Sequence, residues 1–290
     1  SPHIVDYGEA LIRDLMTQYP HIDGIRCDWP EYPPYFLESM FLDFGAHAKR
    51  FAESRGLDFE SMRRSVGKLY TFLTEQLDQS ALEKFLSSPE TFFDQWPGCK
   101  LWLEFKTTLV SNLLRRFKSA VGKDKVLFPS AFPPPWNHLS GFNYSEASNI
   151  VDAVSCKYYT MHWPMMLRNY ADSLTDKNGT LSKASLAACL ANGFDAYFPT
   201  PPSSDQFEYP QPDQNHPVDL DSLASRQTQV ESWAGDTPVW PITHAYGPIE
   251  DFTKRAAAVL AVSKNRLWIN RYAYLSDEKL EALGDLFEER

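Results

Sequence analysis

The sequence lacks the cysteine pattern of a metal-binding domain. Its four cysteines are widely spaced and form neither a Cys-x-x-Cys pair nor a cluster with histidine, so a structural zinc site is not expected. Apolar runs long enough to cross a membrane are also lacking. Positive charge is scarce, since 28 Lys and Arg against 38 Asp and Glu give a net charge of −10. This balance disfavours nucleic acid and acidic membrane surfaces as partners and favours a neutral or cationic small molecule.

Two catalytic signatures are absent as well. No glycine-rich phosphate loop follows any predicted strand, so a nucleotide site has no support. The Gly-x-Ser-x-Gly elbow of serine hydrolases does not occur. No signal peptide is present, but the chain opens on Ser-Pro without a methionine, so the sequence leaves the localisation open.

Apolar and aromatic residues are plentiful. Hydrophobic residues make up 43% of the 290 residues, enough for a sizeable core, and we expect a single domain over residues 1–290. Aromatic residues make up 14%, and their flat faces suit the apolar faces of sugar rings.

Predicted strands and helices alternate along the chain. Short apolar runs predict strands at about 22–28, 126–130, 151–159, 238–246 and 266–272, with a weaker candidate at 196–198. Apolar residues at helical spacing predict helices at about 4–19, 36–53, 60–77, 81–86, 102–120, 182–192, 218–233, 249–262 and from 276 onward. This alternation is typical of a parallel sheet covered by helices.

Polar and aromatic residues gather at the C-terminal ends of these strands, as on the active-site face of a (β/α)8 barrel. We therefore predict an α/β fold of the TIM-barrel type, with a doubly wound sheet as the alternative. Residues 36–100 exceed one crossover helix and are predicted to form a helical insertion after the first strand. Five strands are clear and a closed barrel needs eight, so we expect an incomplete barrel whose missing βα units lie upstream in the same polypeptide.

One stretch, residues 23–35, presents two acids directly after a strand. Asp28 ends the strand and Glu31 follows within three residues, among aromatic side chains and prolines. Arg26 lies two residues before Asp28 and therefore on the same side of the strand, where its positive charge would hold Asp28 ionised. The plain alternative is a structural ion pair at the rim of the sheet.

The motif Gly24-Ile-Arg26-Cys-Asp28 resembles the Gly-x-Arg-x-Asp motif on the fourth barrel strand of the α-amylase-type glycoside hydrolases, where the acid is the nucleophile. More of the chain resembles a looser group, the uncharacterised glycoside-hydrolase-like barrel proteins of bacteria. The Tyr-Pro-rich loop after Asp28 and the stretch Trp268-Ile-Asn270-Arg271-Tyr272 carry this second resemblance. The chain departs from the amylase pattern because 126–136 contains no Glu and Ala245 follows His244.

Glycoside hydrolysis commonly uses two carboxyl groups, one as nucleophile or base and one as acid. Asp28 is the predicted nucleophile or base and Glu31 the nearest candidate acid; Asp205 and Glu208, on a long proline-rich loop, are alternative acids. Side chains near the strand ends are predicted to bind the substrate: Arg26, Trp29, Tyr32, Trp136, Lys157, Tyr159, His162, Trp163, His244, Tyr246, Asn270 and Arg271.

These residues predict a glycoside hydrolase that acts on an oligo- or polysaccharide, with no cofactor and no metal. A carbohydrate-binding barrel that has lost its second acid is the rival interpretation, because the strand-five Glu is missing. A metal-dependent hydrolase using Asp28, His162 and His244 ranks third, since nothing in the sequence fixes the spacing of the ligands.

Overall fold

The computed structural model describes residues 1–88, 91, 94–194 and 203–288. Five strands form one sheet: β1 (Gly24–Asp28), β2 (Val126–Ala131), β3 (Val154–Tyr158), β4 (Val239–His244) and β5 (Trp268–Asn270). All neighbouring strands are parallel, and their order in the sheet is their order in the chain. The predicted α/β fold with a parallel sheet is confirmed. The doubly wound alternative is wrong, because that topology reverses the strand order part-way.

The sheet is curled, so its edge strands approach one another across a concave face. The guanidinium carbon of Arg26 on β1 lies 5.2 Å from the ring centroid of Trp268 on β5. Between them, the ring of Phe128 on β2 lies 5.7 Å from that of Trp268 and 6.4 Å from that of Trp240 on β4. A sheet of five parallel strands with this curvature is half of a barrel.

Alternation along each strand separates two faces of different chemistry. The odd-numbered residues of β1 and β2 and the even-numbered residues of β3 belong to the apolar core, among them Leu127, Val154 and Cys156. Their neighbours face the concave side, where apolar rings near the N-terminal ends give way to polar side chains: Arg26, Asp28, Ser130, Ser155, Lys157, His244 and Asn270. The convex face therefore packs against helices, and the polar side chains that could bind a ligand lie on the concave face.

Helices follow each strand and precede β1. They are α1 (Pro2–Gln18), α2 (Leu37–Met40), α3 (Ala46–Ser54), α4 (Phe59–Thr71), α5 (Gln79–Ser87), α6 (Pro97–Val121), α7 (Trp136–Ser140), α8 (Tyr144–Ala147), α9 (His162–Lys177), α10 (Lys183–Gly193), α11 (Leu220–Ala234), α12 (Ile249–Leu260) and α13 (Asp277–Glu288). A π-helical turn (Phe72–Gln76) and 3-10 turns at Ser204–Gln206 and Tyr272–Tyr274 lie between these helices. Several helices begin at a side-chain cap; Asp219, for example, accepts a hydrogen bond from the backbone N–H of Ser222 at 2.9 Å.

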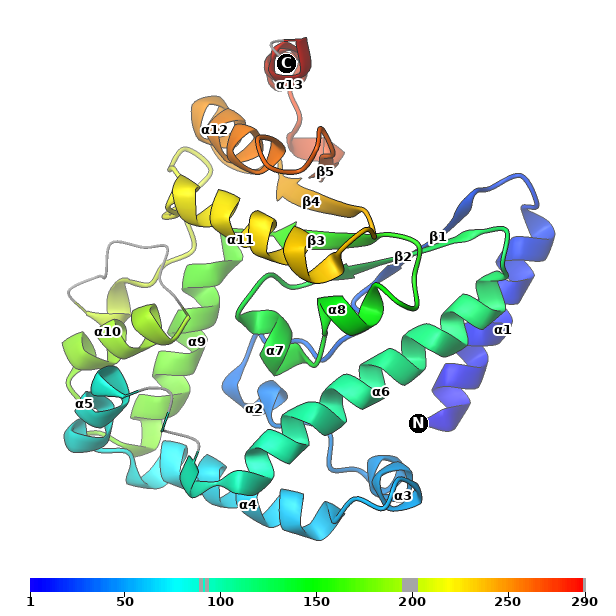
Figure 1. The fold of residues 1–290 in the computed structure, drawn as a ribbon. Coiled ribbons are helices and arrows are strands. Elements are labelled where there is room, and N and C mark those ends of the chain that lie inside the picture. Colours follow the sequence, from blue (N-terminus) through cyan, green and yellow to red (C-terminus); the bar gives the residue numbers. More distant parts are fainter. Residues whose placement is uncertain (89–90, 92–93, 195–202, 289–290) are drawn as a thin grey trace.

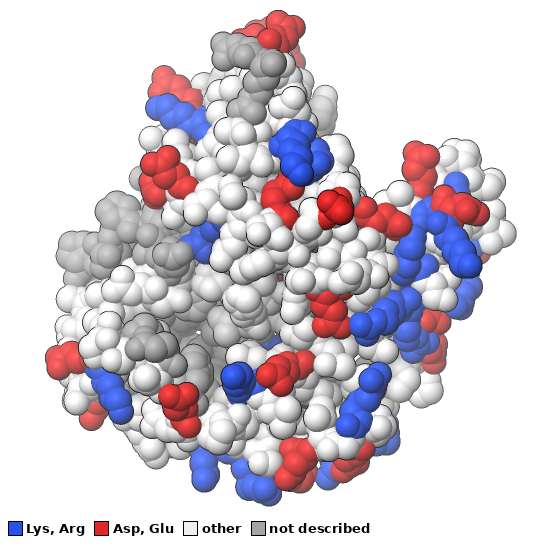
Figure 2. Space-filling model, in the orientation of Figure 1, with Lys and Arg blue, Asp and Glu red and all other residues white. Residues whose placement is uncertain are grey.

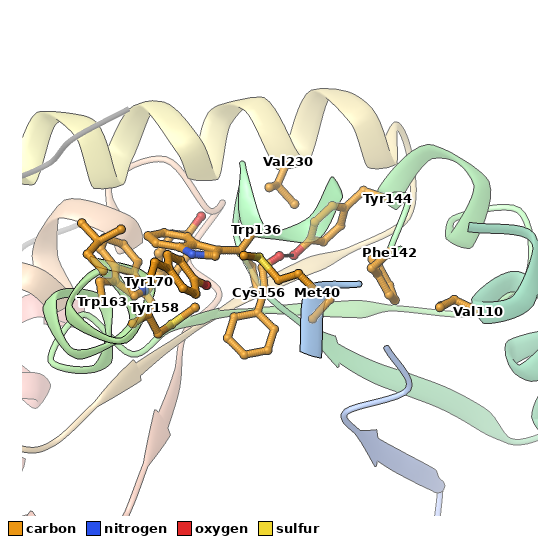
Figure 3. Packing of buried hydrophobic residues seen from close by; sticks show 14 of the residues in the cluster. Met40, Val110, Trp136, Phe142, Tyr144, Cys156, Tyr158, Trp163, Tyr170 and Val230 are labelled. Atoms are coloured by element: carbon orange, nitrogen blue, oxygen red, sulfur yellow. Dashed lines mark hydrogen bonds between the residues drawn. The ribbon is translucent and has the colours of Figure 1, made fainter. Parts of the chain in front are cut away.

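The main core lies between the convex face and the helices. In Figure 1, α6, α8 and α11 lie on one side of the sheet, and α12 and α13 lie beside β4 and β5. Figure 3 shows the aromatic part of this core, where Tyr158 and Cys156 of β3 meet side chains from α7, α8 and α9.

Within residues 36–100, the described parts form short helices: α4 packs on α6 and, with α3, around a second apolar cluster, whereas α5 packs on α10. The predicted helix over 36–53 is wrong in one respect, because the helical conformation is interrupted between α2 and α3. There the carboxylate of Asp43 accepts a hydrogen bond from the N–H of Gly45 at 2.8 Å, and the ring of Phe41 stacks on Trp102. The weak strand candidate at 196–198 lies outside the described residues.

Candidate functional site

The C-terminal ends of the strands place one accessible carboxylate on the concave face. Asp28 is the last residue of β1, and its side chain is 49% exposed. Nη2 of Arg26 lies 3.4 Å from Oδ1 of Asp28, and Nζ of Lys157 on β3 lies 3.9 Å from the same oxygen. Two cations therefore lie beside a carboxylate that is still open to solvent.

Glu31 lies beneath the loop after β1, with a side chain that is fully buried. Its Oε1 accepts a hydrogen bond from the backbone N–H of Phe132 at 2.8 Å, and its Oε2 accepts one from the hydroxyl of Ser140 at 2.5 Å. Burial raises the pKa of the Glu31 carboxyl, against the opposing effects of Lys157, Ser140 and Phe132. A carboxylate with both oxygens engaged inside the protein cannot reach a ligand, so the expectation that Glu31 donates the proton is not supported. We assign it a positioning role.

Lys157 is the buried counterpart of Glu31. Its side chain is 1% exposed, and its Nζ lies 3.4 Å from Oε1 of Glu31. The same Nζ lies 4.5 Å from the ring centroid of Phe132 and 4.9 Å from that of Trp29, and it has no hydrogen-bond partner among the described residues. Burial lowers the pKa of Lys157, and Glu31 and Asp28 oppose that shift. Lys157 therefore fixes the two acids from below, whereas the sequence predicts that it binds the substrate.

Trp29 presents an accessible aromatic face beside Asp28. Its backbone adopts a left-handed conformation (φ 59°), which is uncommon for a bulky residue and is found where surrounding contacts impose it. The indole stacks on Tyr35, with ring centroids 5.2 Å apart and planes 19° apart, and remains 41% exposed. Tyr35 is hydrogen-bonded through its hydroxyl to Nδ1 of His162 at 3.0 Å.

Tyr159, just past β3, connects the middle of the site to β5. The side-chain amide of Asn270 donates a hydrogen bond to the Tyr159 hydroxyl at 2.7 Å. The Tyr159 ring lies 5.5 Å from His244 and 5.7 Å from His162, edge to face in both pairs. Burial, and then the positive charge of Arg271, lowers the pKa of His162 to about 4; burial, His162 and nearby cations lower the pKa of His244 to about 3. Both imidazoles are therefore neutral near pH 7.

We call this set the strand-end site and define it as Asp28, Trp29, Tyr35, Tyr159, His162, His244, Asn270 and Arg271. Its aromatic members extend into a row of rings that ends at Tyr209, Tyr246 and Tyr274. Tyr35 and Tyr274 are not among the predicted site residues. The only sequence signal for Tyr35 is that it ends the proline-rich segment after β1.

Three predicted stacking residues lie elsewhere. Trp136 and Trp163 are fully buried and pack against each other at 5.2 Å between ring centroids, as Figure 3 shows. They belong to the core because α7 and α9 begin at these positions and turn the indoles inward. Tyr32 lies over Nζ of Lys106 on α6, at 5.1 Å from the ring centroid, and not on the concave face. The expected ligand contacts of these three residues are therefore not supported.

Of the alternative acids on the long loop, Asp205 is held by cations of α9 and α10. Asp205 forms ion pairs with Lys183 on α10 at 2.5 Å and with Arg168 on α9 at 3.9 Å. Hydrogen bonding to Lys183 lowers the pKa of the Asp205 carboxyl. Glu208 is exposed, and no contact among the described residues places it at the site.

A second buried lysine supports the site from the C-terminal helix. Nζ of Lys279 on α13 donates hydrogen bonds to the carbonyls of Ala245 at 2.7 Å and Gly247 at 2.8 Å, in the loop after β4. Tyr246 lies in this loop, and its hydroxyl donates to the carbonyl of Pro210 at 3.0 Å. No sequence pattern indicates this role for Lys279, because a lysine on an amphipathic helix is usually solvated.

Metal-binding geometry does not arise among the described residues: no three His, Cys, Asp or Glu side chains are grouped so that they could hold an ion. In the same part of the chain, no helix combines the length and apolar character needed to span a membrane.

Two cavities lie among the described residues, and Trp29 of the strand-end site lines the first. One of about 420 Å³ is bounded by the outer side of the loop 29–32 together with α1, α3 and α6. The other, of about 360 Å³, is lined mainly by apolar residues of α2, α4, α5, α6, α7, α9 and α10.

Comparison of the chain with protein-family models, with curated proteins and with solved structures finds no match of any kind. The case for a function therefore depends on the geometry of the strand-end site.

Proposed function

We propose that the protein is a glycoside hydrolase in which Asp28 is the nucleophile or the general base. The observation that carries the proposal is the half-exposed Asp28 carboxylate at a strand end, flanked by Arg26 and Lys157. An ionised carboxylate in this position could attack an anomeric carbon or activate a water.

The row of rings supports a saccharide as the substrate. Trp29 stacks on Tyr35, Tyr35 contacts His162, and ring contacts continue through Tyr209 to Tyr246. Trp29 and Tyr209 are also exposed, so their faces are accessible to a ligand. Aromatic faces bury the C–H faces of sugars, while Asn270 and the neutral histidines offer hydrogen bonds to hydroxyl groups.

The second carboxyl group is the element that the described residues do not supply, since Glu31 is sealed inside the protein. This observation favours a second candidate function, a carbohydrate-binding protein without hydrolytic activity.

A second acid could also come from a part of the barrel outside the described residues. We propose that three further parallel strands of the same polypeptide pair with β5 and β1, close an eight-stranded barrel and bring a second acid to the rim.

Two open features of the sheet support closure. The outer edges of β1 and β5 have no partner strand among the described residues. On the concave face, Val126 and Trp268 are 38% and 37% exposed, whereas the interior of a closed barrel is filled by side chains. Reading the coding sequence around these 290 residues tests closure directly, because three βα units should be encoded upstream of Ser1. Their absence would contradict the proposal.

The Asp28→Asn variant tests the catalytic assignment against a panel of oligo- and polysaccharides. We expect hydrolysis to fall by roughly 10²- to 10⁴-fold, because an amide can neither attack nor take a proton. Affinity should change little. Asp23→Asn is the matched control, since Asp23 is an exposed acid just before β1, at the end of the strand away from the site.

Full activity of Asp28→Asn would refute the assignment. If the native protein binds glycans and cleaves none of them, the carbohydrate-binding candidate is correct.

A further inference from the structure

The charge at the strand-end site has the opposite sign to that of the whole protein. The chain carries a net charge of −10, and Figure 2 shows acidic and basic side chains interspersed over the face drawn there. Among the described residues, in contrast, the strand-end site and the buried pair beneath it bring together Arg26, Lys157 and Arg271 with Asp28 and Glu31. Charges beyond about 8 Å are screened at physiological salt, so a ligand in the site responds to these five groups rather than to the total.

The net charge of these five groups does not depend on whether the proton of the buried pair is on Lys157 or on Glu31. Lys157 and Glu31 are 3.4 Å apart and contribute zero whether both are charged or both are neutral. Asp28 balances Arg26, its neighbour at 3.4 Å. Arg271 is therefore a positive charge in excess.

Lys279 and Asp213, which carry opposite charges, act at the far end of the site, on His244 and Tyr246 respectively. Arg255 is neutralised by Asp251 at 2.7 Å. The excess positive charge of Arg271 remains after these groups are included.

Arg271 is exposed, and its guanidinium forms no ion pair or hydrogen bond with any described residue. It directly follows Asn270, whose amide is bonded to the Tyr159 hydroxyl at 2.7 Å, and its backbone is in the left-handed conformation (φ 70°). Because Asn270 is bonded to Tyr159, the adjacent Arg271 lies near the centre of the site, and its charge accordingly affects the pKa values of His162, His244 and Tyr159.

We infer that the substrate carries an anionic group, so that the strand-end site takes an acidic saccharide whose carboxylate or sulfate ester is bound by Arg271. A guanidinium offers two parallel N–H donors to such a group, a geometry that a neutral hydroxyl does not use fully. The inference rests on the proposed carbohydrate function and narrows it from sugars in general to uronate-containing or sulfated glycans.

Matched ligands test the inference without changing the protein. Affinity is measured for a uronate-containing oligosaccharide and for the same chain after reduction of its carboxyl groups to alcohols. A second pair compares a sulfated oligosaccharide with its desulfated form. We expect roughly 10- to 100-fold weaker binding after removal of the anion that the site recognises, as for hydrogen bonds to charged groups. The pair that shows the loss identifies the anion.

The Arg271→Gln variant assigns the effect to one side chain. In this variant the ratio of the affinities for the charged and the uncharged member of the pair should fall toward one. The control, Arg64→Gln, removes one positive charge from an exposed position on α4 and should keep the preference.

Equal affinity for both members of both pairs overturns the inference. If such glycans are nevertheless cleaved in an Asp28-dependent way, the proposed glycoside hydrolase function is retained and only the preference for an anionic substrate is refuted. A lack of affinity for every glycan refutes the inference and the proposed function together.

Discussion

Lys157 and Glu31 show how a residue can serve a site without touching a ligand. Both side chains are buried, 3.4 Å apart, and the lysine ammonium lies between the rings of Trp29 and Phe132. Burying two charges is costly, and the cost is offset only while each charge keeps its partner. The pair is therefore expected to be sensitive to the loss of either member.

Replacing Lys157 by Met removes the partner of a buried carboxylate. We expect the free energy of unfolding to fall by about 3–5 kcal/mol, as when a buried ion pair loses one member. Urea denaturation measures the loss. The double variant Lys157→Met with Glu31→Gln should recover most of it, because the new side-chain amide carries no charge and its oxygen can still accept a hydrogen bond from Phe132 or Ser140. A single variant that costs less than about 1 kcal/mol would contradict the buried pair.

The buried histidines make the stability depend on pH. Burial lowers the pKa of His244 to about 3 and that of His216 to about 2, both below the usual 6.5. Between about pH 6.5 and these values the unfolded chain binds more protons, so the free energy of unfolding decreases as the pH falls. Each histidine contributes a slope of up to about 1.4 kcal/mol per pH unit.

Urea titrations between about pH 6 and about pH 4.5, below the ordinary histidine pKa, measure this slope. Acidic groups add to it in the native protein, so the informative comparison is with His216→Gln combined with His244→Gln. In the double variant, the slope of the free energy of unfolding against pH should be smaller by up to the contribution of two protons. A slope equal to that of the native protein would show that these imidazoles titrate normally in the folded state.

The sequence indicates which residues of the site stand at strand ends but not which of them are buried. Asp28, Tyr159, His244 and Asn270 could be placed at one edge because parallel strands end together. The burial of Glu31 depends on the N–H of Phe132 and the hydroxyl of Ser140, 101 and 109 residues away in the chain. No local pattern contains such contacts, so the predicted catalytic role of Glu31 is not supported.

At the level of elements, the opening strand fits its neighbour because of one glycine. Gly24 is the first residue of β1 and pairs with Val126 of β2. A Cβ at this position would collide with the carbonyl oxygen of Val126. The glycine of the Gly-x-Arg-x-Asp pattern is therefore explained by strand packing, independently of any catalytic role.

Gly24→Ala should accordingly weaken the β1–β2 pairing and lower the free energy of unfolding by about 1–3 kcal/mol, the usual cost of overpacking. Gly67→Ala is the matched control. Gly67 lies within α4 with open space around it, so alanine should stabilise the protein by about 0.5–1 kcal/mol. Thermal and urea unfolding of both variants give the comparison. Equal stability of the two variants would contradict the packing role of Gly24.

The elements themselves were largely predictable. All five observed strands lie within or at one residue of predicted ranges, because β-branched and aromatic runs bounded by Pro and Gly are strong signals. Helix boundaries were less predictable where tertiary contacts decide them. The break between α2 and α3 is accompanied by the stacking of Phe41 on Trp102, a residue of the distant helix α6.

At the scale of the molecule, sheet curvature links fold to function. The curled sheet gives the polar side chains a common concave face, while the convex face is covered by helices (Figure 1). The alternation of strands and helices predicts a parallel sheet, but it does not reveal curvature or closure. Those depend on contacts such as that of Arg26 with Trp268, made between the two edge strands.

The open edges lead to a prediction on hydrogen exchange. Among the described residues, the amides of β1 and β5 that face away from β2 and β4 have no strand to bond, whereas β3 is flanked by strands on both sides. Exchange at these outer amides should therefore be close to that of exposed backbone, while the amides of β3 exchange only through larger opening. Exchange measured by NMR or mass spectrometry resolves the three strands.

A polypeptide that also carries the proposed upstream units should protect the outer amides of β1 and β5 and leave those of β3 nearly unchanged. Such protection requires new backbone partners at both edges, which is the defining consequence of barrel closure. Protection at one edge alone would indicate an open sheet with added strands. In that case the second acid of the site would have to be sought at the protected edge rather than around a closed rim.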